Sequence, residues 1–200
     1  DFAVFAMMTN GLLRIMRKKI FYALLLAAMT TAGTVQKARA GVIEDYFSGL
    51  KQDVRQTYDE GTWNVMLPLR VWHNRLTYDD EHIDKYNEEP WGLGFGLTRY
   101  EGENWHGLYA IAFKDSNDYM QTMFGYAYLI NKAIDEEKDW HWGYGYTLGV
   151  TQRHEYSYIP VPLPLPIAAV TYKNFSLNAT YVPGVKNDGN VLFTWLRIDL

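Results

Sequence analysis

Cysteine is absent from this chain of 200 residues. A disulfide framework, a thiol nucleophile and a zinc site with thiolate ligands are therefore excluded together. Long apolar runs are also missing, and the mean hydropathy of −0.26 argues against a bundle of membrane helices. Neither absence excludes a β-barrel that spans a membrane, because its strands need only every second residue to be apolar.

Aromatic residues, in contrast, are abundant. The chain holds 7 Trp, 16 Tyr and 9 Phe, which make up 16% of its residues and exceed what one soluble core needs. With 48% apolar and 21% charged residues, the chain is neither disordered nor collagen-like. Its length predicts either one domain or one domain with a short additional segment.

Residues 1–40 have the pattern of a secretory signal peptide. Basic residues at 14, 17, 18 and 19 precede the apolar run 20–28, and Ala38-Arg39-Ala40 offers small side chains to a signal peptidase. This predicts cleavage before Gly41. A membrane-anchoring helix is the alternative, although the run is shorter than the roughly 20 residues that a spanning helix needs. Because Met16 heads a more typical signal, residues 1–15 are interpreted as a mis-set start.

Removal of this leader leaves an acidic chain. Residues 1–40 hold six of the 19 basic residues and one of the 23 acidic ones, so residues 41–200 carry 13 basic against 22 acidic side chains, a net charge of −9. This balance argues against nucleic acid as a partner, because binding to phosphates needs a basic face. An exported chain without cysteine suits a bacterial cell envelope.

A short amphipathic helix is predicted over residues 42–60. Apolar side chains recur at helical spacing within 42–56, at positions 42, 46, 47, 50 and 54, with charges on the opposite face. Such a helix either caps the domain that follows or lies at a membrane interface.

From residue 63 onward the hydrophobic period changes to two. Bulky and aromatic side chains alternate with small or polar ones most clearly over 140–151. Similar segments follow one another at 63–78, 91–98, 105–113, 120–130, 140–151, 157–172, 174–182 and 190–200. Strands of about ten residues with one apolar face are typical of outer-membrane barrels. The sequence thus predicts an all-β domain over 41–200, an eight-stranded antiparallel transmembrane β-barrel behind an N-terminal amphipathic α-helix.

The inward face of this barrel is expected to be poor in side-chain volume. The small residues assigned to it are Gly92, Gly94, Gly96, Ala110, Ala112, Gly125, Ala127, Gly143, Gly145 and Gly149. An eight-stranded barrel is just wide enough for side chains or one small ligand. We expect a cavity with an apolar rather than charged lining, suited to a hydrocarbon chain. A barrel filled by its larger inward residues is the alternative.

Prolines indicate where pairing between strands of the predicted sheet is weakened. Pro160, Pro162, Pro164 and Pro166 crowd into one segment, and each removes a backbone donor from the ladder. Pro68 and Pro90 do the same near the first two strands. Gaps between strands at these places would let a lipid enter sideways.

A few residues are candidates for chemistry. His73 lies late in the first strand, and Asp115 and Ser116 end the third, so all three are expected at the same rim. A histidine base with a serine and an aspartate suggests acyl transfer. Adjacent residues of a regular strand point to opposite faces, so Asp115 and Ser116 share a site only if the chain bends there.

Other polar clusters predict less. The five histidines have no metal-binding spacing, and no metal site is expected. The acidic stretch 79–89 is interpreted as a solvated loop, with a calcium site as the alternative.

Several longer strings make the chain recognisable. They are Trp72-His73, Asp84-Lys85-Tyr86-Asn87-Glu88-Glu89-Pro90-Trp91-Gly92, Asn104-Trp105-His106-Gly107-Leu108-Tyr109-Ala110, Ala112-Phe113-Lys114-Asp115-Ser116, Tyr158-Ile159-Pro160 and Tyr181-Val182-Pro183-Gly184. From about residue 42 to Leu200 the sequence closely resembles PagP, the lipid A palmitoyltransferase family of Gram-negative outer membranes.

The resemblance implies an activity. Family members move an acyl chain from the sn-1 position of a glycerophospholipid onto a hydroxyacyl chain of lipid A, inside the outer membrane and with no metal or organic cofactor. The catalytic set carried over is His73, Asp115 and Ser116. Whether Ser116 forms an acyl-enzyme or the lipid A hydroxyl attacks directly stays open, as does the oligomeric state, for which a homodimer is one alternative. A non-catalytic barrel that binds lipid or acts structurally is the competing function.

The resemblance also assigns accessory residues. Pro68, Pro90, Pro166 and Pro183 match the prolines beside two lateral lipid gates, and Arg153 matches a loop arginine. His82 stands at the position associated with lipopolysaccharide recognition, and Lys186 replaces a gating tyrosine. The floor of the acyl pocket is Gly in palmitate-selective members, whereas this chain has Ala127, which predicts a slightly shorter or less sharply selected acyl chain.

Overall fold

The computed structural model describes the backbone of residues 37–200 and the side chains of residues 44–200. The predicted signal peptide therefore lies almost entirely outside the described residues. Helix α2 (Lys37–Glu60) begins five residues before the predicted start and ends at the predicted residue. The backbone N–H of Gly61 donates to Thr57 O over 3.1 Å and closes its last turn. None of the helices in the described part of the chain is long and apolar enough to cross a membrane.

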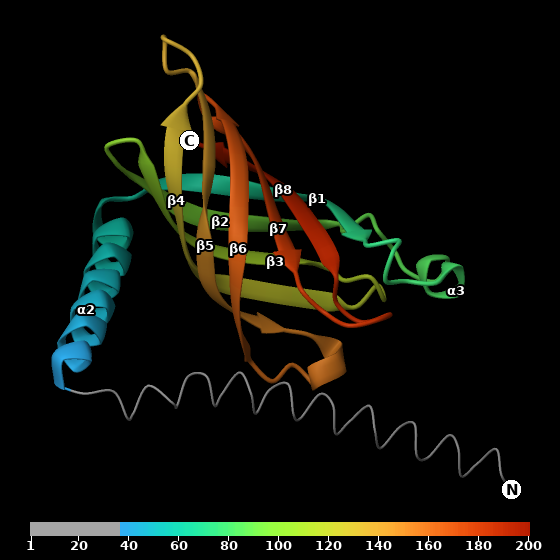
Figure 1. Cartoon of the computed structure of the whole chain (residues 1–200). Coiled ribbons are helices and arrows are strands. Elements are labelled where there is room, and N and C mark those ends of the chain that lie inside the picture. The colour runs from blue at the N-terminus through green and yellow to red at the C-terminus, as the bar shows by residue number, and fades with distance from the viewer. Residues whose placement is uncertain (1–36) are drawn as a thin grey trace, which may run out of the picture. The chain divides into compact units, whose positions relative to one another are not determined.

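Eight antiparallel strands form a closed barrel in which each strand pairs with its neighbours in the sequence (Figure 1). They are β1 (Thr62–His73), β2 (Gly92–Glu101), β3 (Asn104–Lys114), β4 (Met120–Ala133), β5 (Trp140–Gln152), β6 (Val161–Tyr172), β7 (Phe175–Val182) and β8 (Val191–Asp199). Pairing of β1 with β8 closes the ring. The predicted eight-stranded barrel is confirmed, although β1 stops five residues earlier than expected and β6 starts four residues later.

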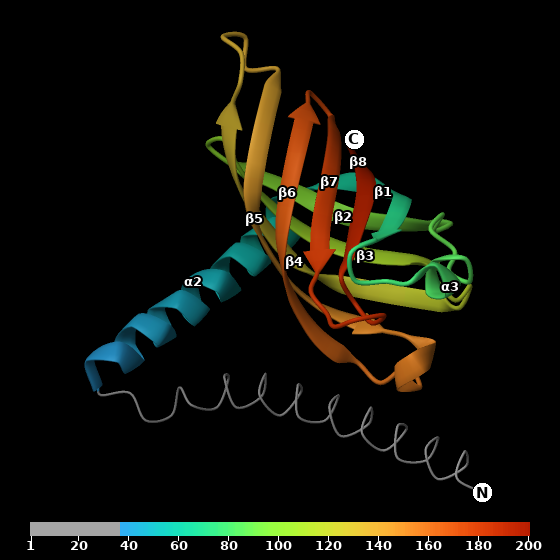
Figure 2. The same ribbon diagram turned by 45° about the vertical axis from the view of Figure 1, so that its right-hand side comes forward.

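One rim of the barrel carries the longer loops. Loops 74–91, 115–119, 153–160 and 183–190 all connect strands at this end, which we call the loop rim. Two short helices lie in these loops, α3 (Asp80–Ile83) and η2 (His154–Tyr156), and Figure 2 shows α3 beside the loop-rim end of β1. The opposite rim has mostly tight connections, so functional loops are concentrated at one end.

The side chains of β3 face the other way from the prediction. Trp105, Ile111 and Phe113 are buried inside the barrel, whereas Ala110 is exposed and Ala112 shares its outward parity. Small residues on neighbouring strands make room for them: a Cβ added at Gly94 would lie 2.8 Å from Ile111. The prediction put all small residues inside, but the lumen alternates large residues on one strand with glycines on the next.

The lumen has an apolar part and a charged part. Met66, Val71, Ile111, Phe113, Met123 and Phe193 form one apolar cluster, and Trp105, Ala127, Leu129, Ile167 and Ala169 form a second. Farther from the loop rim, Arg197 is 1% exposed, with its Nε 3.0 Å from Asp199 and its guanidinium 4.1 Å from the centre of the Trp105 ring. The expectation of a lining without charge is therefore wrong for this end of the barrel, where Asp199 compensates the buried cation.

At two places in the barrel, neighbouring strands stop pairing before they reach the loop rim. The ladder of β1 and β2 ends at Met66 and Gly94, and that of β6 and β7 ends at Ile167 and Thr180. The hydroxyl of Thr180 donates to Pro166 O, so the carbonyl of Pro166 faces β7. In an antiparallel strand the N–H and C=O of one residue point to the same neighbour. The prolines at 162, 164 and 166 share this parity, so the donors they lack would have faced β7.

Candidate functional site

His73 ends β1 at the loop rim, and its side chain is buried. It shares the inward parity of Val71, which belongs to the apolar lumen cluster, so the imidazole lies at the mouth of the lumen. Its ring stacks on Tyr86, with centroids 4.9 Å apart, and meets the edge of Tyr78 at the same distance. These two contacts hold the ring plane in place.

The partner of His73 is a carboxylate that the sequence did not single out. Glu88 Oε1 lies 3.1 Å from His73 Nδ1 and accepts the backbone N–H of His73 over 3.0 Å. Arg75 forms a bidentate pair with Glu88, and Arg70 Nη2 lies 3.2 Å from its Oε2. The hydrogen bonds from Arg75 hold the pKa of Glu88 well below its usual range, so this carboxylate is ionised and accepts a hydrogen bond from each of its partners.

Glu88 was predicted to belong to a solvated acidic loop, and for this residue the prediction is wrong. Its side chain is only 10% exposed, whereas Asp79, Asp80 and Glu81 of the same stretch are exposed as expected. No spacing rule separates Glu88 from the exposed Glu89 that follows it. The only sequence indication was its place in the string that resembles the family.

Asp115 and Ser116 lie in a tight turn after the end of β3. The strand ends at Lys114, so the alternation of faces no longer applies and the required bend is present. Asp115 is buried, and its Oδ1 accepts the backbone N–H groups of Asn117 and Tyr119 over 2.9 and 3.0 Å. The turn is therefore built on the carboxylate of Asp115.

Arg153 approaches the other oxygen of this carboxylate. Its Nη2 lies 3.7 Å from Asp115 Oδ2, and neither that oxygen nor Arg153 Nε has a hydrogen-bond partner among the described residues. The Ser116 side chain is partly exposed, and its backbone O accepts the N–H of Asn87 over 2.9 Å. Asp115 and Arg153 thus each bring one buried polar atom without a hydrogen bond from the described residues to this rim.

The three predicted catalytic residues are gathered at one rim but not in one hydrogen-bonded chain. His73 binds Glu88, while Asp115 binds its own turn and faces Arg153. No hydrogen bond joins His73 to Asp115 or Ser116 within the described residues. Asn87 and Glu88 connect the two groups, because the first contacts Ser116 and the second contacts His73.

His82 and Lys186 are placed on the outside of the loop rim. His82 lies in α3 beside Asp79, which accepts a hydrogen bond from the side chain of Asn187 over 2.8 Å. Lys186, next to Asn187, is exposed. Loops 74–91 and 183–190 therefore present these two basic side chains from neighbouring segments.

Ala127 points into the lumen, as its parity predicted. It is 2% exposed and lines an apolar cavity of about 30 Å³ with Met66, Tyr109, Ile111, Met123 and other residues. The predicted cavity is present but small, since pockets for small molecules usually measure about 300–1,000 Å³. Met66 and Met123 are flexible thioethers, so this cavity can enlarge when their side chains move.

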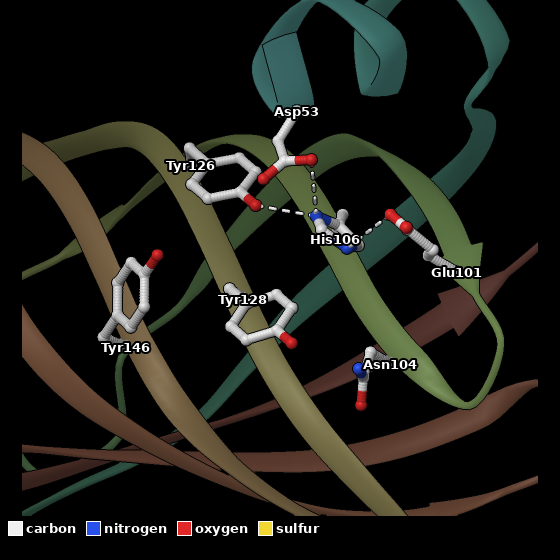
Figure 3. A pocket seen from close by; sticks show the side chains of 7 residues that line it. All are labelled: Asp53, Glu101, Asn104, His106, Tyr126, Tyr128 and Tyr146. Carbon is white, nitrogen blue, oxygen red and sulfur yellow. Dashed lines mark hydrogen bonds and ion pairs between the residues drawn. The ribbon is translucent and has the colours of Figure 1, made fainter. Parts of the chain in front are cut away.

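A second polar cluster lies outside the barrel, against the end of α2. Asp53 of the helix and Glu101 of β2 flank His106 of β3, with oxygens 3.9 and 3.6 Å from its ring nitrogens (Figure 3). The ligand atoms of this trio lie within 4.8 Å of one another and line a pocket of about 400 Å³. Arg99 already pairs with both carboxylates, each over 3.2 Å. The cluster thus joins residues 50–60 to the barrel without needing a cation.

Comparison with known proteins places the chain in a family. A family model described as antimicrobial peptide resistance and lipid A acylation protein PagP matches residues 53–197. The lipid A acyltransferase PagP of Proteus mirabilis (strain HI4320) is 50% identical over 164 residues, which cover 77% of this chain and 74% of that protein. The protein of the same name from Yersinia enterocolitica serotype O:8 / biotype 1B (strain NCTC 13174 / 8081) is 46% identical over 155 residues, covering 77% and 76%. That of Sodalis glossinidius (strain morsitans) is 44% identical over 188 residues, covering 90% and 98%. This chain therefore belongs to the PagP family.

Proposed function

We propose that this chain is a lipid A acyltransferase of the outer membrane, which moves an acyl chain from the sn-1 position of a glycerophospholipid to a hydroxyacyl chain of lipid A. The observation that carries the proposal is the position of His73, a rigidly held imidazole at the mouth of an apolar lumen. An ester whose acyl chain occupies the lumen would present its carbonyl to this rim.

The transfer step follows from the chemistry of an ester and an alcohol. The hydroxyl of the lipid A acyl chain loses its proton to His73, and its oxygen bonds to the ester carbonyl carbon. The bond from that carbon to the glycerol oxygen then breaks, and the proton on His73 passes to the glycerol oxygen to leave a lysophospholipid. Arg153, whose Nη2 lies 3.7 Å from Asp115 Oδ2, would stabilise negative charge on the carbonyl oxygen.

Direct attack by lipid A fits this geometry better than an acyl-enzyme on Ser116. A serine nucleophile needs its base within hydrogen-bond distance, and the described bonds of His73 reach Glu88 but not Ser116. Ser116 then serves as a hydrogen-bond donor near the reacting carbonyl.

Lateral entry of the donor lipid is supported by the two unpaired strand edges. Pro68 and Pro90 flank the β1–β2 separation, and Pro166 and Pro183 flank the β6–β7 separation. Both separations lie toward the loop rim and lead to the apolar half of the lumen. A phospholipid in the surrounding leaflet could insert one chain between these strands while its headgroup stays outside.

The test is transfer by the refolded protein in detergent micelles that contain one phospholipid of defined sn-1 chain together with lipid A. Mass spectrometry should find lipid A heavier by one acyl group and an equal amount of lysophospholipid. His73→Ala should abolish both products, whereas His154→Ala, an exposed histidine of the same rim, should not. A barrel that only binds lipid would give neither product in any variant.

The leader is a separate part of the proposal. Cleavage before Gly41 would remove residues 1–40, including the first four residues of α2. Intact mass of the protein from outer membranes should begin at or near Gly41. Retention of residues 20–28 in the membrane-bound protein would identify them as an anchor instead.

A further inference from the structure

The carboxylate that contacts the imidazole at the loop rim is Glu88. Its Oε1 lies 3.1 Å from Nδ1 of His73 and, at 3.0 Å, also accepts the backbone N–H of the same residue. A single oxygen therefore contacts His73 twice, once at the ring and once at the main chain. An ionised carboxylate has no proton to give, so the proton in this contact belongs to Nδ1. The other ring nitrogen, Nε2, keeps its lone pair.

The supports of Glu88 make this arrangement rigid. Arg75 binds both carboxylate oxygens, Arg70 reaches Oε2, and the backbone O of Glu88 accepts the N–H of Val71 over 3.0 Å. Glu88 is thus tied to β1 through its main chain and its side chain. With the ring of His73 stacked on Tyr86, rotation of the imidazole would break at least two contacts at once.

Asp115 is occupied elsewhere. One of its oxygens closes the 115–119 turn, and the other faces Arg153 at 3.7 Å. The carboxylate that orients the His73 base is therefore Glu88 of loop 74–91, and not Asp115 of loop 115–119.

We propose that Glu88 is the positioning residue of the acyl transfer, fixing His73 with its proton on Nδ1 and stabilising the imidazolium that forms when Nε2 takes the proton of the attacking hydroxyl. This inference rests on the proposed function. No bond to substrate forms at Glu88, and its carboxylate stays ionised throughout: the proton travels from the lipid hydroxyl to Nε2 and then to the departing glycerol oxygen.

A purely structural role for Glu88 is the competing explanation, because the residue also anchors loop 74–91. The variants Glu88→Gln and Glu88→Asp separate the two roles. Gln keeps the size but removes the charge, and its single acceptor oxygen cannot serve the donors that bind both oxygens of Glu88. Asp keeps the charge on a shorter stem. Glu89→Gln is the matched control, since Glu89 is adjacent, exposed and carries the same charge.

The first readout is kinetic. Glu88→Gln should lower kcat by about 10²-fold or more with little change in KM, because a wrongly held base affects the transition state rather than lipid binding. Glu88→Asp should recover part of this loss. Glu89→Gln should match the wild type. Equal losses in Glu88→Gln and Glu89→Gln, or wild-type kcat in Glu88→Gln, would overturn the inference.

The second readout is the pH profile. The charged or titratable groups facing His73 are Glu88, Arg75, Arg153, Tyr78 and Tyr86, and Glu88 supplies the negative charge among them. Removal of that charge should move the acidic limb of kcat/KM to lower pH in Glu88→Gln, since the imidazolium loses its counter-charge. An unmoved limb with a raised KM would indicate a loop anchor and overturn the proposal.

The third readout does not require activity. Ring ¹⁵N shifts of His73 in micelles should report a proton on Nδ1 in the wild type and in Glu88→Asp, and imidazolium signals that appear only at lower pH in Glu88→Gln, which lacks the counter-charge. Wild-type His73 protonated on Nε2 would overturn the inference even if Glu88→Gln did not refold. If the wild type transfers no acyl group, the proposed function fails, whereas an active wild type with an equally active Glu88→Gln removes only the role of Glu88.

Discussion

The hydroxyl of Thr180 donates to the carbonyl oxygen of Pro166 over 2.7 Å, and beyond this bond β6 and β7 no longer pair. The chain contains no cysteine, so pairs of introduced cysteines can be joined selectively across this edge. Joining Leu165→Cys to Val182→Cys with a short bis-maleimide should lower acyl transfer at least ten-fold if a substrate enters here.

The matched control joins Ala168→Cys to Ala179→Cys, which are direct partners in the paired part of the same two strands. This cross-link should leave transfer unchanged, and so should N-ethylmaleimide on either double variant. Full activity after cross-linking at 165 and 182 would show that neither substrate uses the β6–β7 opening.

Ala127→Gly should lengthen the preferred acyl chain. The methyl group of Ala127 projects into the lumen cavity, and one methylene in an apolar pocket is worth roughly 1–3 kcal/mol of discrimination. That is enough to move the optimum by about one carbon. The comparison uses phospholipids that differ only in sn-1 length, with the lipid A products resolved by mass.

Ala169→Gly is the control for this change, because Ala169 is buried in the same cluster as Ala127 but is not among the residues lining the cavity. It should leave the product distribution as in the wild type. Identical distributions for Ala127→Gly and wild type would show that Ala127 is not the floor of the acyl pocket.

Asp115→Asn and Asp115→Ala should lose acyl transfer to the same extent, but only Asp115→Ala should also lose stability. Asn retains an acceptor for the N–H groups of Asn117 and Tyr119, whereas Ala leaves both unsatisfied, at about 1–3 kcal/mol of unfolding free energy. Both variants remove the charge that faces Arg153, so both should lose transfer by roughly ten-fold or more. Urea unfolding in detergent and the mass assay measure the two effects, and an Asn variant as active as wild type would contradict the role of the charge.

Asp53→Asn should destabilise the protein without reducing transfer. Asp53 pairs with Arg99, which is 11% exposed, and this contact joins residues 50–60 to β2. Weakening a half-buried pair of this kind should lower the unfolding free energy by about 1–3 kcal/mol. Asp59→Asn, which removes an exposed pair with Arg55 within α2, should change it by less than about 0.5 kcal/mol. Equal unfolding curves for the two variants would contradict the prediction.

The contact between loops 74–91 and 183–190 should weaken in acid. Hydrogen bonds from the side chains of His82 and Asn187 lower the pKa of Asp79 to about 2. Because the folded-state pKa is depressed, the stabilisation is complete above the ordinary aspartate value of about 3.9 and is lost as the pH falls toward 2. Amide exchange of the Asn187 side chain should rise in this range in the wild type, and an Asp79→Asn variant should show no such rise.

Regular alternation of side chains made the strands predictable. Segment 140–151 has an uninterrupted period of two, and β5 occupies Trp140–Gln152. Alternation does not say which face is inside, and in β3 the assumption that small residues line the lumen assigned the wrong face. Ile111 and Phe113 lie inside because glycines on the adjacent strand β2 leave them space, a relation between strands that one strand's sequence does not contain.

The site was predictable only in part, for a similar reason. His73 and Asp115 could be placed at one rim by counting antiparallel strands. The choice between Glu88 and Glu89 depends on the path of a long loop, and only the folded loop turns Glu88 toward Arg75 and His73 while Glu89 faces solvent. Side-chain partners in loops are set by tertiary contacts, not by spacing.

The prolines of β6 also decide what can attach to the open edge of the sheet. An exposed strand edge normally invites another strand, because it offers alternating donors and acceptors. Along residues 161–166 this edge offers carbonyl oxygens, but the prolines at 162, 164 and 166 supply no N–H. A foreign strand could complete only half of its ladder there. This edge of the sheet can therefore stay unpaired without recruiting a strand from another protein, and an apolar chain, which needs no hydrogen bonds, would meet no such obstacle there.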